Sequence, residues 1–226
     1  MFKGGKVSLV IPCHNEEEGL ALVLKRKPSV IDEVIVIDND SCDNTSPVAK
    51  ENGADVVFVR EKGYGAAYLA GLPRATGEYI IIMDGDDSYP IDEAEKLLEC
   101  LSEKGADLVS GCRFPLSDKR AMPRYKQISN SLISFFIRKM FRIDLADSQS
   151  GMLVFRKGLI DEINPSNRGM GFSQEIKILS WTRPGLKCIE EHISYRQRAG
   201  KIKFRSVRDG LGNLYDCILL RGRRSK

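Results

Sequence analysis

Short apolar runs alternate with amphipathic stretches over the first half of the chain. The runs are rich in Val and Ile and bounded by polar residues, which predicts strands. Unbroken apolar runs suit strands that are covered on both faces, as in a mostly parallel sheet. The predicted strands are Lys6–Ile11 (ending at Pro12), Glu33–Asp38, Asp55–Val59, Glu78–Met83 and Asp107–Ser110.

The stretches between these strands have helical spacing. Glu16–Lys27 and Asp92–Lys104 each place Leu residues on one face, and Ser46-Pro47 is typical of an N-cap followed by the first helical residue. Alternation of strands and helices predicts an open α/β sheet. In such sheets ligands bind beyond the carboxyl ends of the strands.

Polar clusters follow three of the predicted strands, at Pro12–Glu16, Asp38–Thr45 and Asp84–Pro90. Acidic groups that converge on one sheet edge repel one another unless a cation or hydrogen-bond donors compensate them. Helix capping is the alternative interpretation for Asp43–Ser46 and Asp92. Capping accounts for single residues but not for the coincidence of all three clusters.

Asp84-Gly85-Asp86 is the most informative of these clusters. In an extended strand, residues i and i+2 point to the same side, so both carboxylates face one point. A magnesium ion that carries a diphosphate takes one or two protein carboxylates and completes its shell with phosphate and water. An isolated Asp-x-Asp triplet is common, so its meaning depends on the surrounding motifs.

Composition narrows the functional classes. The chain has 226 residues and a net charge of +4, but Arg196–Lys226 is strongly basic, which suggests an anionic partner. The six scattered cysteines and two histidines make no zinc pattern. Cysteines spaced in this way are typical of free thiols in a reducing cytoplasm. We expect no signal peptide and no transmembrane helix, because no apolar run is long enough.

The ordered set of motifs resembles family 2 glycosyltransferases of the GT-A fold, and among them the dolichyl- or polyprenyl-phosphate hexosyltransferases. The resemblance spans nearly the whole chain. It rests on Val10–Glu17, Ile37–Thr45, Gly63–Ala67, Asp84–Pro90, Asp147–Gly151, Gly171-Phe172 with Glu175, and Tyr195–Arg198 with Gly200, Lys201 and Lys203.

The resemblance implies roles for individual residues. It implies a single domain over residues 1–226, with a nucleotide-sugar half (1–112) and an acceptor half (113–226). It also implies a Mg²⁺ or Mn²⁺ cofactor and a GDP- or UDP-hexose donor. The implied catalytic residues are Asp84, Asp86, Arg113 and Arg198; the donor-binding residues are Pro12, His14, Glu16, Asp38, Asp84, Gly85, Asp86 and Arg113; the acceptor-phosphate residues are Arg124, Ser150, Arg198 and Lys203; and the metal ligands are Asp84, Asp86 and Ser88.

The chain departs from the family pattern at four positions. His14 stands where Tyr is frequent, and Asn39 and Asp40 replace an Asp-Gly pair. These changes leave the preferred base open. Ser88 stands where several relatives place a Gln ligand, which leaves the metal shell open.

Chemistry separates the possible acceptors. The family is inverting, so transfer would reverse the anomeric configuration of the sugar. A lipid monophosphate is largely dianionic at neutral pH, so such an acceptor attacks without a general base. A sugar hydroxyl would need a base, and Asp87 or Glu175 would be the first to test. The predicted function is hexose transfer (mannose or glucose type) to polyprenyl or dolichyl phosphate. Transfer to a soluble or cell-surface glycan and catalytically silent sugar-nucleotide binding are the alternatives.

Two amphipathic stretches in the second half suit a lipid acceptor. Ile128–Ile143 and Arg205–Arg221 carry apolar faces flanked by basic residues, so they either lie at a membrane interface or pack against the core or a second subunit. We expect a peripheral protein on the inner, cytoplasmic face of the membrane, with a membrane-anchoring partner or a homo-oligomer as further partners. No nucleic-acid module accompanies the basic tail. Gly63-x-Gly65 is a weak match to a dinucleotide fingerprint, because Tyr68 replaces its third Gly.

Overall fold

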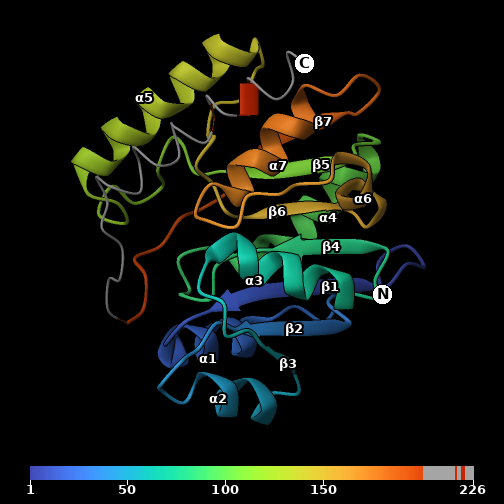
Figure 1. Cartoon of the computed structure of the whole chain (residues 1–226), viewed down its shortest axis with the longest axis vertical. Helices are drawn as coiled ribbons and strands as arrows, with labels where there is room; N and C mark the ends of the chain where they lie inside the picture. Colours follow the sequence, from blue (N-terminus) through green and yellow to red (C-terminus); the bar gives the residue numbers. More distant parts are fainter. Residues whose placement is uncertain (201–216, 218–219, 222–226) are drawn as a thin grey trace.

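The computed structural model describes residues 1–200, 217 and 220–221. Within these residues the strands form one sheet in the order β3-β2-β1-β4-β6-β5-β7 (Figure 1). Strand β6 runs antiparallel to both its neighbours, and the other pairs are parallel. The strands are β1 (Val7–Cys13), β2 (Glu33–Asp38), β3 (Asp55–Phe58), β4 (Tyr79–Ile82), β5 (Leu108–Cys112), β6 (Leu153–Arg156) and β7 (Cys188–His192).

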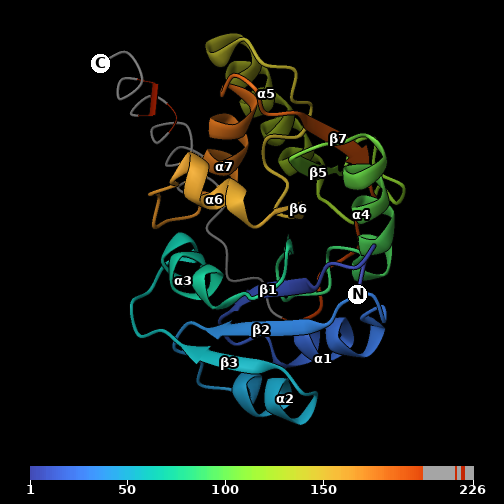
Figure 2. The ribbon, with the colours of Figure 1, turned by 90° about the vertical axis from the view of Figure 1, so that its right-hand side faces the viewer.

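Helices cover both faces of the sheet, which makes three layers (Figure 2). Helices α1 (Glu17–Arg26), α2 (Thr45–Glu51) and α4 (Ala94–Glu103) lie on one face. The other face carries α3 (Tyr64–Gly71), α6 (Gly158–Ile163) and α7 (Phe172–Trp181). Two 3₁₀ turns, η1 (Leu72–Arg74) and η2 (Ile91–Glu93), join these elements, and α5 (Arg124–Phe141) lies at the β7 end of the sheet.

Alternate residues of the central strands supply the two cores. In β1, Leu9 and Ile11 pack under α1 and α4, whereas Val10 packs under α3. In β4, Ile81 faces the first core and Ile80 the second. Burial on both faces explains why the strand sequences are continuously apolar, and the predicted α/β architecture is confirmed.

The predicted strands all form: β2 has the predicted bounds, and the other four have shifted ends. Strand β1 continues through Pro12 to Cys13, so the prediction that it ends at Pro12 was wrong. Strand β4 pairs with β1 only as far as Val10. Pro12 has no N–H to donate, but it lies beyond the last pair with β4, so no hydrogen bond between these strands is lost. Helix α2 begins at Thr45 after Asn44, so Ser46 is a helical residue and not the N-cap.

The second half joins the same sheet through β6 and β7, which the sequence patterns did not predict. Helix α5 contains most of the predicted amphipathic stretch, and its buried side packs against α7 through Ile137. Cys217 and Leu220 pack there too, but most of the predicted Arg205–Arg221 helix lies outside the described residues. In the part of the chain described, no helix has the length and hydropathy to cross a bilayer.

Candidate active site

Loops that follow β1, β2 and β4 meet at the carboxyl edge of the parallel strands. The Glu16 N–H donates to Thr45 Oγ1 over 2.8 Å, which joins the first two loops. Arg198 joins the first and third: its Nη2 lies 2.9 Å from both carboxylate oxygens of Glu16, and its Nη1 lies 3.5 Å from Asp86 Oδ2. The expected convergence of the polar clusters is therefore present, with Arg198 between two carboxylates.

Asp84 lies at the centre of this site. Its Oδ1 accepts a hydrogen bond of 2.7 Å from the Tyr64 hydroxyl. Burial and the nearby Asp86 charge raise the pKa of Asp84 to about 7, against the lowering effects of Tyr64 and Arg113. The backbone of Gly151 lies so near that an added Cβ would be 3.5 Å from Asp84 Oδ1. Asp84 is therefore a crowded carboxylate whose charge is only partly compensated.

This pair of carboxylates fits a divalent cation that arrives with a diphosphate. Burial, and after it repulsion from Asp86, raise the pKa of Asp84, and a bound cation would offset both effects. Across residues 1–200, 217 and 220–221, no group of three or more His, Cys, Asp or Glu side chains converges as a metal site. Two carboxylates completed by phosphate and water are the usual protein contribution to a Mg²⁺ shell.

Ser88 supports Asp86 in this structure. Its hydroxyl and its N–H donate to Asp86 Oδ1 over 2.5 and 3.1 Å, and the side chain is buried. One oxygen of Asp86 is thereby fixed, and the other, Oδ2, faces Arg198. The expected place of Ser88 among the metal ligands stays a prediction, and its observed contact is with Asp86.

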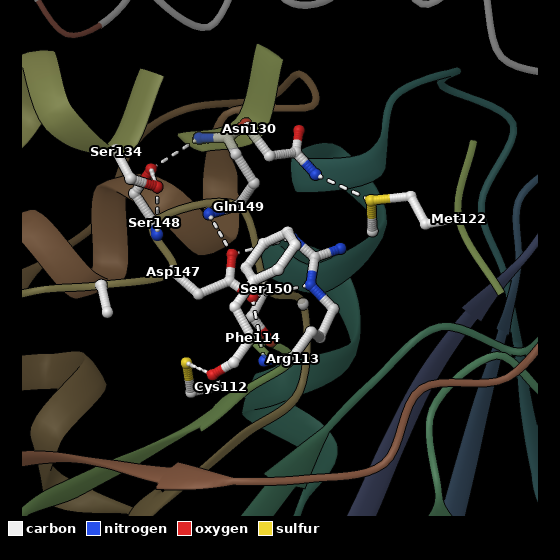
Figure 3. Close-up of polar contacts among 12 residues, drawn as sticks. Cys112, Arg113, Phe114, Met122, Asn130, Ser134, Asp147, Ser148, Gln149 and Ser150 are labelled. Atoms are coloured by element: carbon white, nitrogen blue, oxygen red, sulfur yellow. Dashed lines mark hydrogen bonds and ion pairs between the residues drawn. The ribbon is translucent and has the colours of Figure 1, made fainter. Parts of the chain in front are cut away.

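Arg113 is fixed by Asp147, a partner that the sequence patterns did not assign (Figure 3). Its Nε donates to Asp147 Oδ2 over 2.7 Å and its Nη2 to Oδ1 over 2.8 Å. The guanidinium also lies 5.2 Å from the centre of the Tyr195 ring. Although burial opposes it, the charge of Arg113 lowers the pKa of Asp147. Arg113 thus stays charged inside the protein, close enough to lower the pKa of Asp84.

Lys177 is a fully buried residue of the site region that the sequence analysis missed. Its Nζ donates to the carbonyl oxygens of Asp147 and Ser150 over 3.1 and 2.6 Å. Burial lowers the pKa of Lys177 to about 7. The lysine therefore holds the segment from Asp147 to Ser150 at both ends, and Gly151 follows directly. A lysine between Ile176 and Ile178 on an apolar helix was the available signal.

The expected nucleoside loop is internally hydrogen-bonded. His14 Nδ1 lies 2.8 Å from the carbonyl oxygen of Asn39, so Nδ1 carries the proton. Asn39 donates to the Val59 and Glu61 carbonyls over 2.9 and 2.6 Å, which an Asp at this position would be unable to do. The buried Asp38 carboxylate accepts from the Ser41 N–H over 2.9 Å and from the Ser46 hydroxyl. Asp38 and Asn39 thus shape the loop.

The two candidate bases, Asp87 and Glu175, both bind other groups of the protein. Asp87 forms a two-oxygen contact with Arg26 Nη1, at 2.8 and 2.6 Å. Glu175 accepts the N–H groups of Ser166 and Asn167 over 2.9 and 2.7 Å. Their carboxylates therefore hold a guanidinium and a loop.

The remaining predicted residues are spread over the acceptor half. Arg124 begins α5 and is exposed, and Ser150 is buried with no hydrogen-bond partner for its Oγ. Lys203 lies outside the described residues.

The Gly63–Ala67 segment begins α3, where Gly65 and Ala66 donate their N–H groups to the carbonyls of Gly169 and Arg168. These amides are occupied by the protein itself, which argues against the dinucleotide interpretation.

Comparisons with known proteins bear on the family and the fold of this chain. Residues 8–163 match the model of the family described as glycosyl transferase family 2. A low-salt glycan biosynthesis hexosyltransferase of Haloferax volcanii is 31% identical over 90% of this chain, which spans 51% of that relative. A dolichyl-phosphate hexose transferase of the same organism is 30% identical, with 87% of this chain and 86% of the relative covered.

A solved structure shares the fold. Glucosyl-3-phosphoglycerate synthase from Mycobacterium tuberculosis, in complex with Mn²⁺, UDP and phosphoglyceric acid, gives a TM-score of 0.76 at 21% identity. The match covers 96% of this chain and 78% of that one. The three-layer architecture is thus that of GT-A glycosyltransferases, and the chain belongs to glycosyl transferase family 2.

Proposed function

We propose that this chain is an inverting, metal-dependent hexosyltransferase that moves a hexose from a UDP- or GDP-hexose to polyprenyl or dolichyl phosphate. The observation that carries the proposal is the position of Arg198, whose guanidinium lies between Glu16 and Asp86 at the carboxylate pair. Arginine binds phosphate oxygens in two-point contacts. A phosphate-binding group therefore lies beside the carboxylates that would hold the donor diphosphate.

The contacts of the candidate bases favour a phosphate acceptor over a hydroxyl acceptor. Asp87 is paired with Arg26, and Glu175 holds the loop at Ser166 and Asn167. A hydroxyl nucleophile would need one of them to take its proton in the transition state. A phosphate dianion needs cations to approach the donor, and Arg113 and Arg198 supply positive charge at this edge.

Each residue then has a task. Asp84 and Asp86, with the support of Ser88, would hold Mg²⁺ or Mn²⁺, which when bound neutralises charge on the departing nucleotide. Arg113, kept in place by Asp147, would lie beside the donor phosphates or the transferred sugar. Arg198 would bind phosphate, with Arg124, Ser150 and Lys203 as the further acceptor residues. Pro12, His14, Glu16 and Asp38 belong to the loops that would border the nucleoside.

Helix α5 supports a membrane-bound acceptor. Five of its apolar side chains are at least half exposed, and no acidic residue occurs between Arg124 and Phe141. Such a face suits the cytoplasmic surface of an anionic bilayer, where apolar groups enter the interface and basic groups meet lipid phosphates. The exposed residues are Tyr125, Ile128, Leu132, Phe135 and Phe136.

The names of relatives point the same way. Besides the Haloferax dolichyl-phosphate hexose transferase, a dolichol-phosphate mannosyltransferase of Pyrococcus furiosus is 29% identical over 96% of this chain, which spans 65% of that relative. The solved structure of glucosyl-3-phosphoglycerate synthase favours the other class, because it contains phosphoglyceric acid, a water-soluble molecule. An acceptor panel decides between these two classes.

The deciding experiment incubates the chain with Mn²⁺, radiolabelled UDP- and GDP-hexoses, and either polyprenyl phosphate or phosphoglyceric acid. Labelled sugar that enters the organic phase with polyprenyl phosphate is the expected result, and the productive donor identifies the base. The Asp86→Asn variant serves as the inactive control. Label found only in water-soluble product would overturn the lipid acceptor, and donor binding without any transfer would indicate a silent binding protein.

A further inference from the structure

The segment Tyr195–Gly200, here called the strap, lies along the metal motif. The Arg196 N–H donates to the Ser88 carbonyl over 2.9 Å, and the Ala199 N–H donates to the Asp86 carbonyl over 2.8 Å. These two backbone bonds fix the strap at both sides of Arg198. The Arg198 side chain is thereby directed at the site, with only 21% of its surface exposed.

The contacts of Arg198 are divided between two carboxylates. Nη2 binds both oxygens of Glu16 at 2.9 Å, whereas Nη1 lies 3.5 Å from Asp86 Oδ2. The contact with Glu16 is thus a close two-oxygen hydrogen bond, and the contact with Asp86 is a longer electrostatic one. Glu16 and Asp86 are each 13% exposed. In such partly buried surroundings, charge interactions are stronger than on an open surface.

The oxygen of Asp86 that Arg198 faces is the one that remains for another cation. Oδ1 already accepts the hydroxyl and N–H of Ser88. Oδ2 faces the guanidinium and belongs to the carboxylate that the proposed function gives to the metal. The single positive charge of Arg198 therefore lies at the place where we expect a divalent cation when the donor is bound.

We propose that Arg198 serves as the counter-cation of Asp86 in the unloaded enzyme, and that it is exchanged for the divalent cation when the site is loaded. Glu16 keeps the guanidinium in the site during this exchange, because its two hydrogen bonds do not involve Asp86. The Nη1 group released from Asp86 is then available to phosphate oxygen. This inference rests on the metal role of Asp86 in the proposed function, and it assigns Arg198 a task before any acceptor binds.

The test measures the binding of Mn²⁺ alone, by the EPR signal of the free ion, with no nucleotide and no acceptor. Replacing Arg198 by Gln removes both a competitor for Asp86 and a nearby positive charge. We expect Arg198→Gln to bind Mn²⁺ about tenfold more tightly than the unmodified chain. Arg198→Lys keeps the charge but loses the fork that reaches two carboxylates, so its affinity is expected to lie in between.

Arg196→Gln is the matched control. It removes the same charge from the same strap, but the Arg196 guanidinium is bound to Asp92, with both oxygens at 2.7 Å, and its longer contact of 4.0 Å is with Asp87 and not with Asp86. We expect its Mn²⁺ affinity to change less than about threefold, since screening weakens charges that are not in contact. Equal tightening in Arg196→Gln and Arg198→Gln would overturn the exchange and leave only a general charge effect.

A second variant separates this inference from the proposed function. Asp86→Asn is expected to lose Mn²⁺ binding whether or not Arg198 competes for the site. If Asp86→Asn binds Mn²⁺ as the unmodified chain does, the metal role itself is overturned. If Asp86→Asn loses binding while Arg198→Gln does not gain it, the exchange alone is overturned. Mn²⁺ should also raise the melting temperature of Arg198→Gln more than that of the unmodified chain, which checks that this variant is folded.

Discussion

Arg113 and Asp147 form a two-point ion pair inside the protein, with Nε to Oδ2 at 2.7 Å and Nη2 to Oδ1 at 2.8 Å. The Arg113 side chain is 6% exposed and that of Asp147 is not exposed. The Arg113 N–H also donates to Asp147 Oδ2 over 3.1 Å. The pair joins the end of β5 to the loop that contains Gly151. It therefore connects Arg113 to the loop that lies beside Asp84.

Replacing Asp147 by Asn should destabilise the fold strongly. The change leaves the buried Arg113 charge without its partner, which typically costs about 3–5 kcal/mol in free energy of unfolding. Urea unfolding followed by circular dichroism measures this loss. Glu162→Gln is the control, because the Arg183–Glu162 pair is nearly half exposed and should contribute less than about 1 kcal/mol. Similar losses in the two variants would contradict the structural role given to Asp147.

Such buried pairings mark the limit of what the sequence predicts. The five strands of the first half and α1, α4 and α5 followed from periodicity, because both faces of the sheet are buried and each helix has one apolar face. Strands β6 and β7 were missed: Leu153–Arg156 is only four residues long, and Cys188–His192 contains two glutamates. A short or partly polar strand is defined by its neighbours in the sheet, which periodicity does not reveal.

The site shows the same division. Asp84, Asp86 and Arg198 were predicted from motifs, and the structure brings them to one edge. The partners Asp147 for Arg113 and Arg26 for Asp87 were not predicted, since they are distant in sequence and depend on how strands and helices pack. Lys177 lay in an apolar helix, and only the structure shows that its amine reaches two carbonyl oxygens.

Lys177 predicts an unusual dependence of stability on pH. Burial lowers its pKa to about 7, whereas an unfolded lysine keeps a value near 10.5. Between these values the unfolded chain binds more protons, so Lys177 makes the free energy of unfolding rise with pH by up to about 1.4 kcal/mol per unit. Below pH 7 this contribution is flat. Urea titrations of the unmodified chain and Lys177→Met from pH 7 to 10 measure the difference, and parallel curves would contradict the lowered pKa.

The apparent affinity for Mn²⁺ should fall below neutral pH. Burial and Asp86 raise the pKa of Asp84 to about 7, and a metal binds only the deprotonated carboxylate. Well below pH 7 each further unit should weaken binding about tenfold, and above pH 8 the affinity should level off. The Tyr64 hydroxyl lowers this pKa, so Tyr64→Phe should move the midpoint to higher pH. EPR titrations of Mn²⁺ from pH 5.5 to 8.5 test both statements, and an unchanged affinity across that range would contradict them.

Asp86→Asn should abolish transfer while the fold persists, with a loss of at least about 100-fold in kcat, because the variant loses a carboxylate that in the proposed function holds the charge-neutralising cation. Asp87→Asn provides the contrast. Asp87 pairs with Arg26 and is not needed as a base when the acceptor is a phosphate, so this variant should lose much less. Initial rates with polyprenyl phosphate, checked against circular dichroism spectra, compare the two. An Asp87→Asn variant as inactive as Asp86→Asn would instead favour a hydroxyl acceptor.

The exposed face of α5 should be needed for binding to anionic membranes. Phe135 is 52% exposed on a helix with no acidic residue, so Phe135→Glu replaces an apolar group by a negative charge where the lipid phosphates would lie. Burying one such ring contributes about 1.5–3 kcal/mol, so the variant should bind phosphatidylglycerol vesicles at least about tenfold more weakly in a sedimentation assay. Phe58→Glu is the matched control, because Phe58 is 59% exposed on β3, the edge strand farthest from α5 in the sheet. Equal losses would mean that net charge, and not the α5 face, governs adsorption, and no loss in either would remove the membrane from the proposed function.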